Sequence, residues 1–375
     1  MAMTFAERLA QIRLAMQERG LDLLVAIHDG AHFIEKPNPV MVLTRFKSLG
    51  PAAALLDRDG QLSLIVTPAW DRDRAAEECP DACVVAADDV VDGITEARRR
   101  TGSTEQRITV GVAGRKFLPW AFAERVTAAL PAVQPAVDDV VFGPARRKTD
   151  EEIAHAREAT RIAELGYDEL LRVAQPGMSE DELAVHLRHT TKMLGAEDNF
   201  LLLCAGPHNR AVQPSTGRRF APGDIIVAEI TPSYRGQLAQ ICRTAVLGRP
   251  SAQLTTKYRL VVEAMQAGIS AAVPGVPMGQ VCRAVNAVLE RENYGEYCHP
   301  PHIRRRGHGL GFGSLRPGDV SLDNETILEP DMVFMIHPNQ YLPETGYLLC
   351  GEPVLMTDRG AEPLTRHQAA LGEIR

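Results

Sequence analysis

The sequence contains no run of eighteen apolar residues, which is about the length that a membrane-spanning helix needs. Its first twenty residues mix acidic and basic side chains and lack the apolar core of a signal peptide. We therefore expect no membrane partner and a cytoplasmic location.

An excess of positive charge is also missing. The net charge is −7 and the pI is near 5.9, and the arginine runs at 98–100 and 304–306 stand alone. This excludes an extended basic surface, so we expect no nucleic-acid partner. The seven cysteines are irregularly spaced and odd in number, which favours reduced thiols over a disulfide framework.

The sequence is long enough to form two hydrophobic cores, since its 375 residues exceed the length at which a single core usually stops growing. Helical and strand-like segments alternate up to about residue 140, which predicts an α/β layered domain with a central sheet. A Pro-rich loop from His28 to Val40 interrupts this pattern and is either functional or flexible. We place the domains at 1–145 and 146–375.

The second region repeats one plan: a helix, Pro-Gly, a second helix and then strands, first from about residue 150 and again from about residue 255. This predicts an α+β domain built from two halves about a pseudo-two-fold axis, with a cleft between them. Chance recurrence of two helix pairs is the alternative, and periodicity does not decide between these interpretations.

Four segments in a fixed order identify a resemblance: FAPGDIIVAEITPSYRGQLAQICRTAVLG, GHGLGFG, LEPDMVFMIHPNQY and VLMTDRGAEPLT. Over nearly all of its length the chain resembles the superfamily of creatinase, aminopeptidase P and methionine aminopeptidase. The resemblance implies the pita-bread fold, with duplicated halves around a curved antiparallel sheet.

In metal-dependent members of this superfamily, two aspartates, a histidine and two glutamates hold a pair of divalent ions. The matching positions in this sequence are Glu229, Gln240, His308, His337 and Gly351, the last beside Glu352. Two neighbouring ions need bridging carboxylates, and this set does not provide them. We therefore expect no metal cofactor; the alternative is one divalent ion held by Glu229, His308 and His337, since two imidazoles and a carboxylate form a known ligand set.

Creatinase works without metal, and its hairpin also replaces the aspartates, so the resemblance implies a metal-independent, creatinase-like enzyme. It would hydrolyse or rearrange a C–N bond in a small carboxylate-bearing amino acid derivative. Where creatinase uses a glutamate on the second strand, this chain has Cys242. Two alternatives stay open: a mononuclear metal-dependent hydrolase, lyase or oxygenase, and a binding module without catalysis.

We expect His308 or His337 to carry the proton, because hydrolysis needs a base and an acid, with Glu229 either as its partner or as the group that binds a substrate cation. Gln240, Cys242 and Glu352 are then expected to bind substrate. The alternative is a polar core network in which these groups only satisfy one another. Cys242 is either a nucleophile or a buried filler.

Two more residues are assigned from the resemblance. His208 lies in the loop where the family places a catalytic histidine, although it reaches that place only with an offset of four residues; a surface histidine is the alternative. Leu315 stands where peptidases have a second histidine, and Arg316 beside it is either a clamp for a substrate carboxylate or a solvated loop residue. Because a partner subunit often borders the site in this fold, we expect a homodimer.

Overall fold

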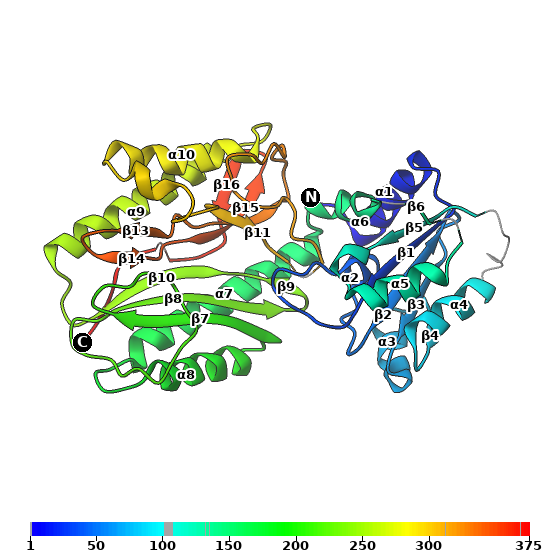
Figure 1. The fold of residues 1–375 in the computed structure, drawn as a ribbon, viewed down its shortest axis with the longest axis horizontal. Coiled ribbons are helices and arrows are strands. Elements are labelled where there is room, and N and C mark those ends of the chain that lie inside the picture. The colour runs from blue at the N-terminus through cyan, green and yellow to red at the C-terminus, as the bar shows by residue number, and fades with distance from the viewer. Residues whose placement is uncertain (1, 101–107, 132, 135, 312, 368) are drawn as a thin grey trace. The chain divides into compact units, whose positions relative to one another are not determined.

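The computed structural model describes the chain apart from residues 1, 101–107, 132, 135, 312 and 368. It contains two compact units: residues 3–149 with 311–316 form the first, and residues 150–310 with 317–375 form most of the second (Figure 1). The domain limits at 145 and 146 stay a prediction, and the segment 311–316 groups with the first unit rather than with its neighbours in sequence. Within the described ranges, no helix is long and apolar enough to cross a membrane.

The first unit is an α/β layer built on a mixed sheet with the strand order β4-β3-β2-β1-β5-β6. Strand β1 is buried at every position, as expected of a central strand covered on both faces. The strands are β1 (Leu23–His28), β2 (Ala52–Asp57), β3 (Leu62–Val66), β4 (Cys83–Ala86), β5 (Val110–Ala113) and β6 (Val133–Gln134). The helices are α1 (Phe5–Glu18), α2 (Pro39–Thr44), η1 (Ala69–Asp71), α3 (Arg72–Glu78), α4 (Val90–Arg100), η2 (Arg115–Phe117), α5 (Trp120–Ala128), α6 (Asp138–Phe142) and η3 (Pro144–Arg146). The α/β prediction is confirmed.

The first half of the second unit places a helix pair on an antiparallel sheet. Ser179 and Glu182 form a capping box that starts the second helix of the pair. The sheet order is β17-β10-β8-β7, and β9 pairs with β8. The elements are α7 (Asp150–Val173), α8 (Glu180–Met193), β7 (Asp198–Gly206), β8 (Ile225–Tyr234), β9 (Gln237–Leu238), β10 (Ile241–Leu247) and β17 (Gly372–Ile374).

The second half repeats the plan with another helix pair and the sheet β11-β12-β15-β16. Figure 1 shows the strands of the unit between the pair α7 and α8 and the pair α9 and α10. The elements are α9 (Ala252–Ala271), α10 (Met278–Arg291), η4 (Gly295–Cys298), β11 (Gly307–Gly309), β12 (Val333–Ile336), β13 (Gln340–Leu342), β14 (Gly346–Leu348), β15 (Glu352–Thr357) and β16 (Gly360–Pro363). This is the predicted α+β pita-bread architecture.

Side-chain alternation along β8 and β10 decides which groups face the helices. Ile226, Ala228 and Ile230 belong to the hydrophobic core that includes residues of α7 and α8. Because side chains alternate between the two faces of a strand, Glu229 points to the opposite face. Cys242 pairs with Glu229 in the β8–β10 register, so both side chains lie on the face away from the helices.

Candidate active site

Glu229 is the centre of a buried polar cluster on this inner face. Its Oε2 accepts a hydrogen bond from Gln240 Nε2 at 3.2 Å, and its Oε1 accepts one from Asn339 Nδ2 at 3.0 Å. The Cys242 thiol donates to Oε1 at 3.7 Å, a normal length for sulfur. The structure therefore brings Glu229, Gln240 and Cys242 together, as the sequence predicted, and adds Asn339.

Burial dominates the ionisation of this cluster. It raises the pKa of Glu229, while the hydrogen bonds from Cys242 and Asn339 act in the opposite direction. Burial and the neighbouring Glu229 raise the pKa of Cys242 well above its ordinary value. Cys242 is thus a thiol that donates a hydrogen bond, which favours the filler interpretation over the nucleophile because the thiolate is the reactive form.

Asn339 is a site residue that the sequence interpretation missed. Its backbone has φ 33°, in the left-handed region that Asn tolerates better than most residues. Its Oδ1 accepts the N–H of Cys350 at 3.3 Å, which turns Nδ2 toward Glu229. The available signal was its place in the LEPDMVFMIHPNQY segment, two residues after His337.

His308 and His337 form a second polar group, on β11 and directly after β12. Their ring centroids lie 5.3 Å apart in an edge-to-face arrangement. His308 is half-buried, and its Nδ1 donates to the carbonyl of Gly309 at 3.0 Å. His337 is 7% exposed, and its Nδ1 is buried without a hydrogen-bond partner among the described residues. Burial, followed by the electrostatic effect of the neighbouring His308 and Arg305, lowers the pKa of His337 well below its ordinary value, so its imidazole is neutral.

A side chain at position 351 would overlap with His337. A Cβ atom on Gly351 would lie 2.5 Å from the Cβ of His337, closer than real Cβ atoms approach. Two side chains therefore do not fit at these positions together, although both correspond to glutamates in the family.

Glu352 is held elsewhere, in a buried ion pair. One of its oxygens lies 3.0 Å from Arg243, and the Arg243 guanidinium also donates to the carbonyl oxygens of Gly351 and Cys242, at 2.7 and 3.0 Å. Burial raises the pKa of Glu352 despite this partner. The described contacts of Glu352 hold the fold together. They do not support its predicted role in substrate binding, which stays a prediction.

The two loop residues assigned from the resemblance have separate surroundings. His208 is exposed, its Nε2 lies 2.9 Å from the carbonyl oxygen of Pro343, and its ring contacts Tyr341 with 5.7 Å between centroids. Arg316 belongs to the first unit, where it forms an ion pair with Asp139 at 2.6 Å. These contacts match the alternatives of a surface histidine and a loop arginine, and the catalytic and clamp roles stay predictions.

The side chains at the family's ligand positions do not fit a pair of divalent ions. Both oxygens of Glu229 accept hydrogen bonds from side chains, Gln240 is neutral, and Gly351 has no room for a carboxylate. In the part of the chain that the structure describes, no three His, Cys, Asp or Glu side chains are grouped as a metal site. The three-residue set of Glu229, His308 and His337 is therefore not assembled either.

Comparison with known proteins assigns the fold to a family. Residues 154–358 match the model of metallopeptidase family M24. A Xaa-Pro dipeptidase of Pyrococcus furiosus is 27% identical over 369 residues, which cover 97% of this chain and 99% of the relative. A prolidase structure from Pyrococcus furiosus superposes with a TM-score of 0.79 at 25% identity, covering 95% of this chain and 99% of that one. A Xaa-Pro dipeptidase structure from Bacillus anthracis gives 0.83 at 21% identity, covering 99% and 100%, and supports the fold.

These comparisons correct two expectations from the sequence. The main functional prediction, a metal-independent creatinase-like enzyme acting on a C–N bond, is wrong, because relatives aligned along nearly the whole chain carry dipeptidase and prolidase names. The prediction of no cofactor is wrong as well, because the matched family is one of metallopeptidases. The alternative of a metal-dependent, peptidase-family hydrolase agrees better with the comparisons.

The matched region spans both halves of the second unit and contains the Glu229 cluster together with His308 and His337. It covers more than half of the 375 residues, and the resemblance deduced from four sequence segments leads to the same superfamily. This chain belongs to metallopeptidase family M24, a family of hydrolases with the pita-bread fold.

Proposed function

We propose that this chain hydrolyses an amide bond in a small, peptide-like substrate and does not hold the pair of ions that metal-dependent members of the superfamily hold. The observation that carries the proposal is the buried cluster around Glu229 together with the imidazole pair of His308 and His337. The Pyrococcus furiosus relative is named a Xaa-Pro dipeptidase, which supports a substrate of dipeptide size.

The imidazole pair supplies a proton acceptor for the attacking water. Amide hydrolysis needs such an acceptor and also a donor to the leaving nitrogen. Because Nδ1 of His308 donates to Gly309, the lone pair of this tautomer is on Nε2, which is able to take the proton. The neutral His337 beside it is a weaker base, because its lowered pKa opposes protonation, and this leaves His308 as the proton acceptor.

Glu229 is suited to the donor role. A buried carboxyl with a raised pKa keeps its proton to a higher pH than an exposed one and is therefore able to protonate a leaving nitrogen. The amides of Gln240 and Asn339 fix the position of its two oxygens. This division of roles gives acid and base functions to groups on opposite halves of the unit.

The test is hydrolysis of a panel of dipeptides, with and without a prolyl residue, by the wild type and by two variants. We expect turnover in the wild type and its loss in His308→Ala and Glu229→Gln, with both variants folded by circular dichroism. His302→Ala, which changes an exposed histidine, is the matched control and should keep full activity. Unchanged turnover in either site variant, or none in the wild type with any dipeptide and added Mn²⁺, would refute the proposal.

The number of bound ions is measured separately, by elemental analysis of untagged protein dialysed against Mn²⁺, Co²⁺ or Zn²⁺. We expect fewer than two tightly bound ions per chain, because the position of Gly351 offers no ligand and Gln240 offers no charge. Two ions per chain would contradict this part of the proposal while leaving the hydrolase assignment intact.

Two finer expectations from the sequence stay predictions. A homodimer is expected from the resemblance, and sedimentation velocity of the full chain would test it. A cytoplasmic location stays an expectation from the sequence, and cell fractionation would test it.

A further inference from the structure

Arg306 is a buried cation without a carboxylate partner in the described structure. The residue is 1% exposed, and its bonds go to neutral groups. Nε donates to Asn286 Oδ1 at 2.7 Å, and Nη1 donates to the carbonyl oxygen of Pro338 and, at 3.0 Å, to Gln340 Oε1. Nη2 is buried and has no hydrogen-bond partner among the described residues. A buried charge is costly unless an opposite charge and a full set of hydrogen bonds compensate it, and Arg306 has neither.

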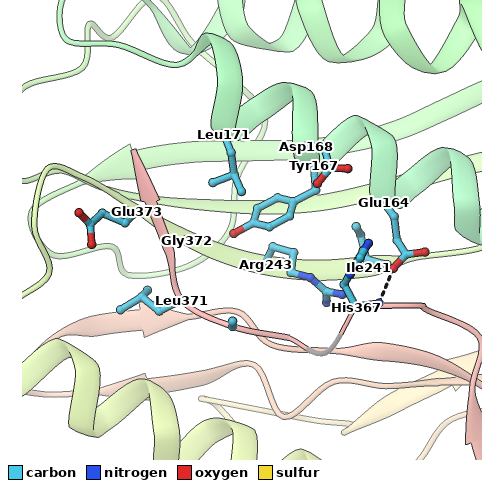
Figure 2. Close-up of a pocket in the computed structure, with 11 residues that line it drawn as sticks. Glu164, Tyr167, Asp168, Leu171, Ile241, Arg243, His367, Leu371, Gly372 and Glu373 are labelled. Carbon is cyan, nitrogen blue, oxygen red and sulfur yellow. Dashed lines mark hydrogen bonds between the residues drawn. The ribbon is translucent and has the colours of Figure 1, made fainter. Parts of the chain in front are cut away.

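Arg243 shows how the same unit compensates another buried guanidinium. It lines a cavity of about 310 Å³ between α7 and β17, where Figure 2 shows it beside Tyr167 and Ile241. One oxygen of Glu352 lies 3.0 Å from this guanidinium. The charge of Arg243 is thus balanced within the protein, whereas that of Arg306 is not.

The unpartnered Nη2 of Arg306 is directed toward a different cavity. This cavity has a volume of about 140 Å³ and is lined by Arg306 and by Asn286 of α10, the acceptor of Nε. The acceptors of Nη1, Pro338 and Gln340, are not among its lining residues. Because the guanidinium is a rigid planar fork in which Nη2 lies on the same side as the Nε–H bond, Nη2 faces the cavity together with Nε.

The arginines and carboxylates at this cavity leave a positive balance. Arg305 is paired with Asp319 at 3.0 Å. This leaves the exposed Arg304 and the buried Arg306 against one carboxylate among the described lining residues, the exposed Asp323. Since a surplus of positive charge attracts anions and repels cations, the lining selects an anionic ligand.

Two thiols form part of the wall and do not supply the missing charge. Burial raises the pKa of Cys282 to about 11 and also raises the pKa of Cys298. Both are therefore neutral near pH 7, and a thiol sulfur is only a weak acceptor. The group that completes Arg306 is an anionic oxygen from outside the chain.

We propose that this cavity binds a small oxyanion of the size of phosphate, with one oxygen accepting a hydrogen bond from Nη2 of Arg306 and with Arg304 at the rim. Charge-assisted bonds from a guanidinium to phosphate are among the stronger hydrogen bonds in proteins. Neither the Glu229 cluster nor the imidazole pair lines the cavity, so the site is additional to the hydrolytic site and does not depend on the proposed function.

The site also supports a segment of the candidate active site. The carbonyl oxygen of Arg306 accepts the backbone N–H of His337 at 2.8 Å, and its Nη1 binds the carbonyl oxygen of the next residue, Pro338. An anion that neutralises the Arg306 guanidinium is therefore expected to stabilise the folded protein around His337.

The test is calorimetry of inorganic phosphate on the full chain at constant ionic strength. We expect saturable binding of one ion per chain with a Kd on the order of 1 mM. The melting temperature should rise with phosphate, because the ion binds the folded state. No saturable binding at phosphate concentrations up to about tenfold above this Kd would overturn the proposal.

Asn286→Asp locates the binding at Arg306. The new carboxylate would stand where the amide oxygen now accepts Nε–H and would supply the counter-charge from within the protein. It should weaken phosphate binding by at least about tenfold. Asn293→Asp makes the same charge change at an exposed position outside the cavity and is the matched control, with an unchanged Kd. Phosphate binding that a folded Asn286→Asp protein keeps in full would overturn the proposal.

A second set of variants avoids a buried substitution. Arg304→Gln should weaken phosphate binding by roughly threefold, because exposed charge pairs are individually weak. Arg259→Gln removes an exposed cation outside the cavity and should change nothing. Glu229→Gln should keep phosphate binding, so loss of hydrolysis and loss of the anion site are distinguishable. Equal effects of the two arginine variants, or loss of phosphate binding in Glu229→Gln, would overturn the proposal.

Discussion

The two halves of the second unit hold their site residues by different means. In the first half, Glu229 is fixed by hydrogen bonds from Gln240, Asn339 and Cys242. In the second half, His337 has a buried Nδ1 without a partner in the described structure and is held by close packing against Gly351. One half therefore depends on polar complementarity and the other on shape.

This difference indicates where each half tolerates change. A hydrogen-bonded cluster loses a moderate amount of stability when one donor is removed, since a single bond contributes about 1 kcal/mol net. A packed contact without free space is more sensitive, because an added atom has to displace its neighbours. The chemistry also differs, since the packed half supplies the neutral imidazole of His337 and the bonded half supplies a carboxyl with a raised pKa.

The largest expected effect is on catalysis in the packed half. His308→Ala should lower kcat by about 10³-fold, the range found for loss of a general base. Stopped assays of dipeptide hydrolysis with His302→Ala as the control would measure it. A decrease in kcat smaller than about tenfold would show that His308 is not the general base. The packed half would then not supply the base that this comparison assigns to it.

The next effect is on stability at the packed contact. Gly351→Ala should lower the free energy of unfolding by about 3 kcal/mol, because its Cβ would lie 2.5 Å from both His337 Cβ and Met335 Cε. Urea denaturation would measure the change. Gly217→Ala is the matched control, since nothing lies within 4 Å of an added Cβ there. Equal stabilities of the two variants would show that the second half is not held by packing.

The third effect is a pH dependence in the hydrogen-bonded half. The pKa of Glu229 is raised in the folded state, so its contribution to stability is fully present below pH 4.5 and is lost as the pH rises through the folded pKa. The Glu229→Gln variant has no ionisable carboxyl at this position and therefore lacks this pH-dependent contribution to stability. The free energy of unfolding of the variant relative to wild type should therefore increase with pH above about 4.5, by at most about 1.4 kcal/mol per pH unit.

Denaturation of both proteins at pH 4 to 8 would measure this difference. The pKa of His337 is lowered, so its own contribution has the opposite sign and is lost as the pH falls below about 6.5 in both proteins. A difference between Glu229→Gln and wild type that does not vary with pH would show that Glu229 is not protonated by its burial.

The smallest expected effect is that of Cys242. Cys242→Ala removes two hydrogen bonds of the sulfur, one donated to Glu229 and one accepted from Asn339, and should cost about 1 kcal/mol of stability, with turnover largely kept. Thermal denaturation and the same hydrolysis assay would measure both. Complete loss of turnover in a folded Cys242→Ala protein would instead support the nucleophile alternative.

The sequence by itself determined the architecture and part of the site. Alternating apolar segments predicted strands and helices in both units, because each strand and helix has a local periodicity that its residues reveal directly. The pita-bread fold itself was implied by the resemblance that the four motifs carry. The resemblance also singled out Glu229 and Gln240, and their side chains are hydrogen-bonded.

Only the tertiary structure decided which groups meet across the halves. Asn339 is 110 residues from Glu229 in sequence, and the mutual exclusion of side chains at 337 and 351 arises where two strands come together. It also placed Glu352 beside Arg243, away from Glu229. Periodicity records the face on which a side chain lies, whereas its partner, its burial and its pKa depend on contacts between distant segments.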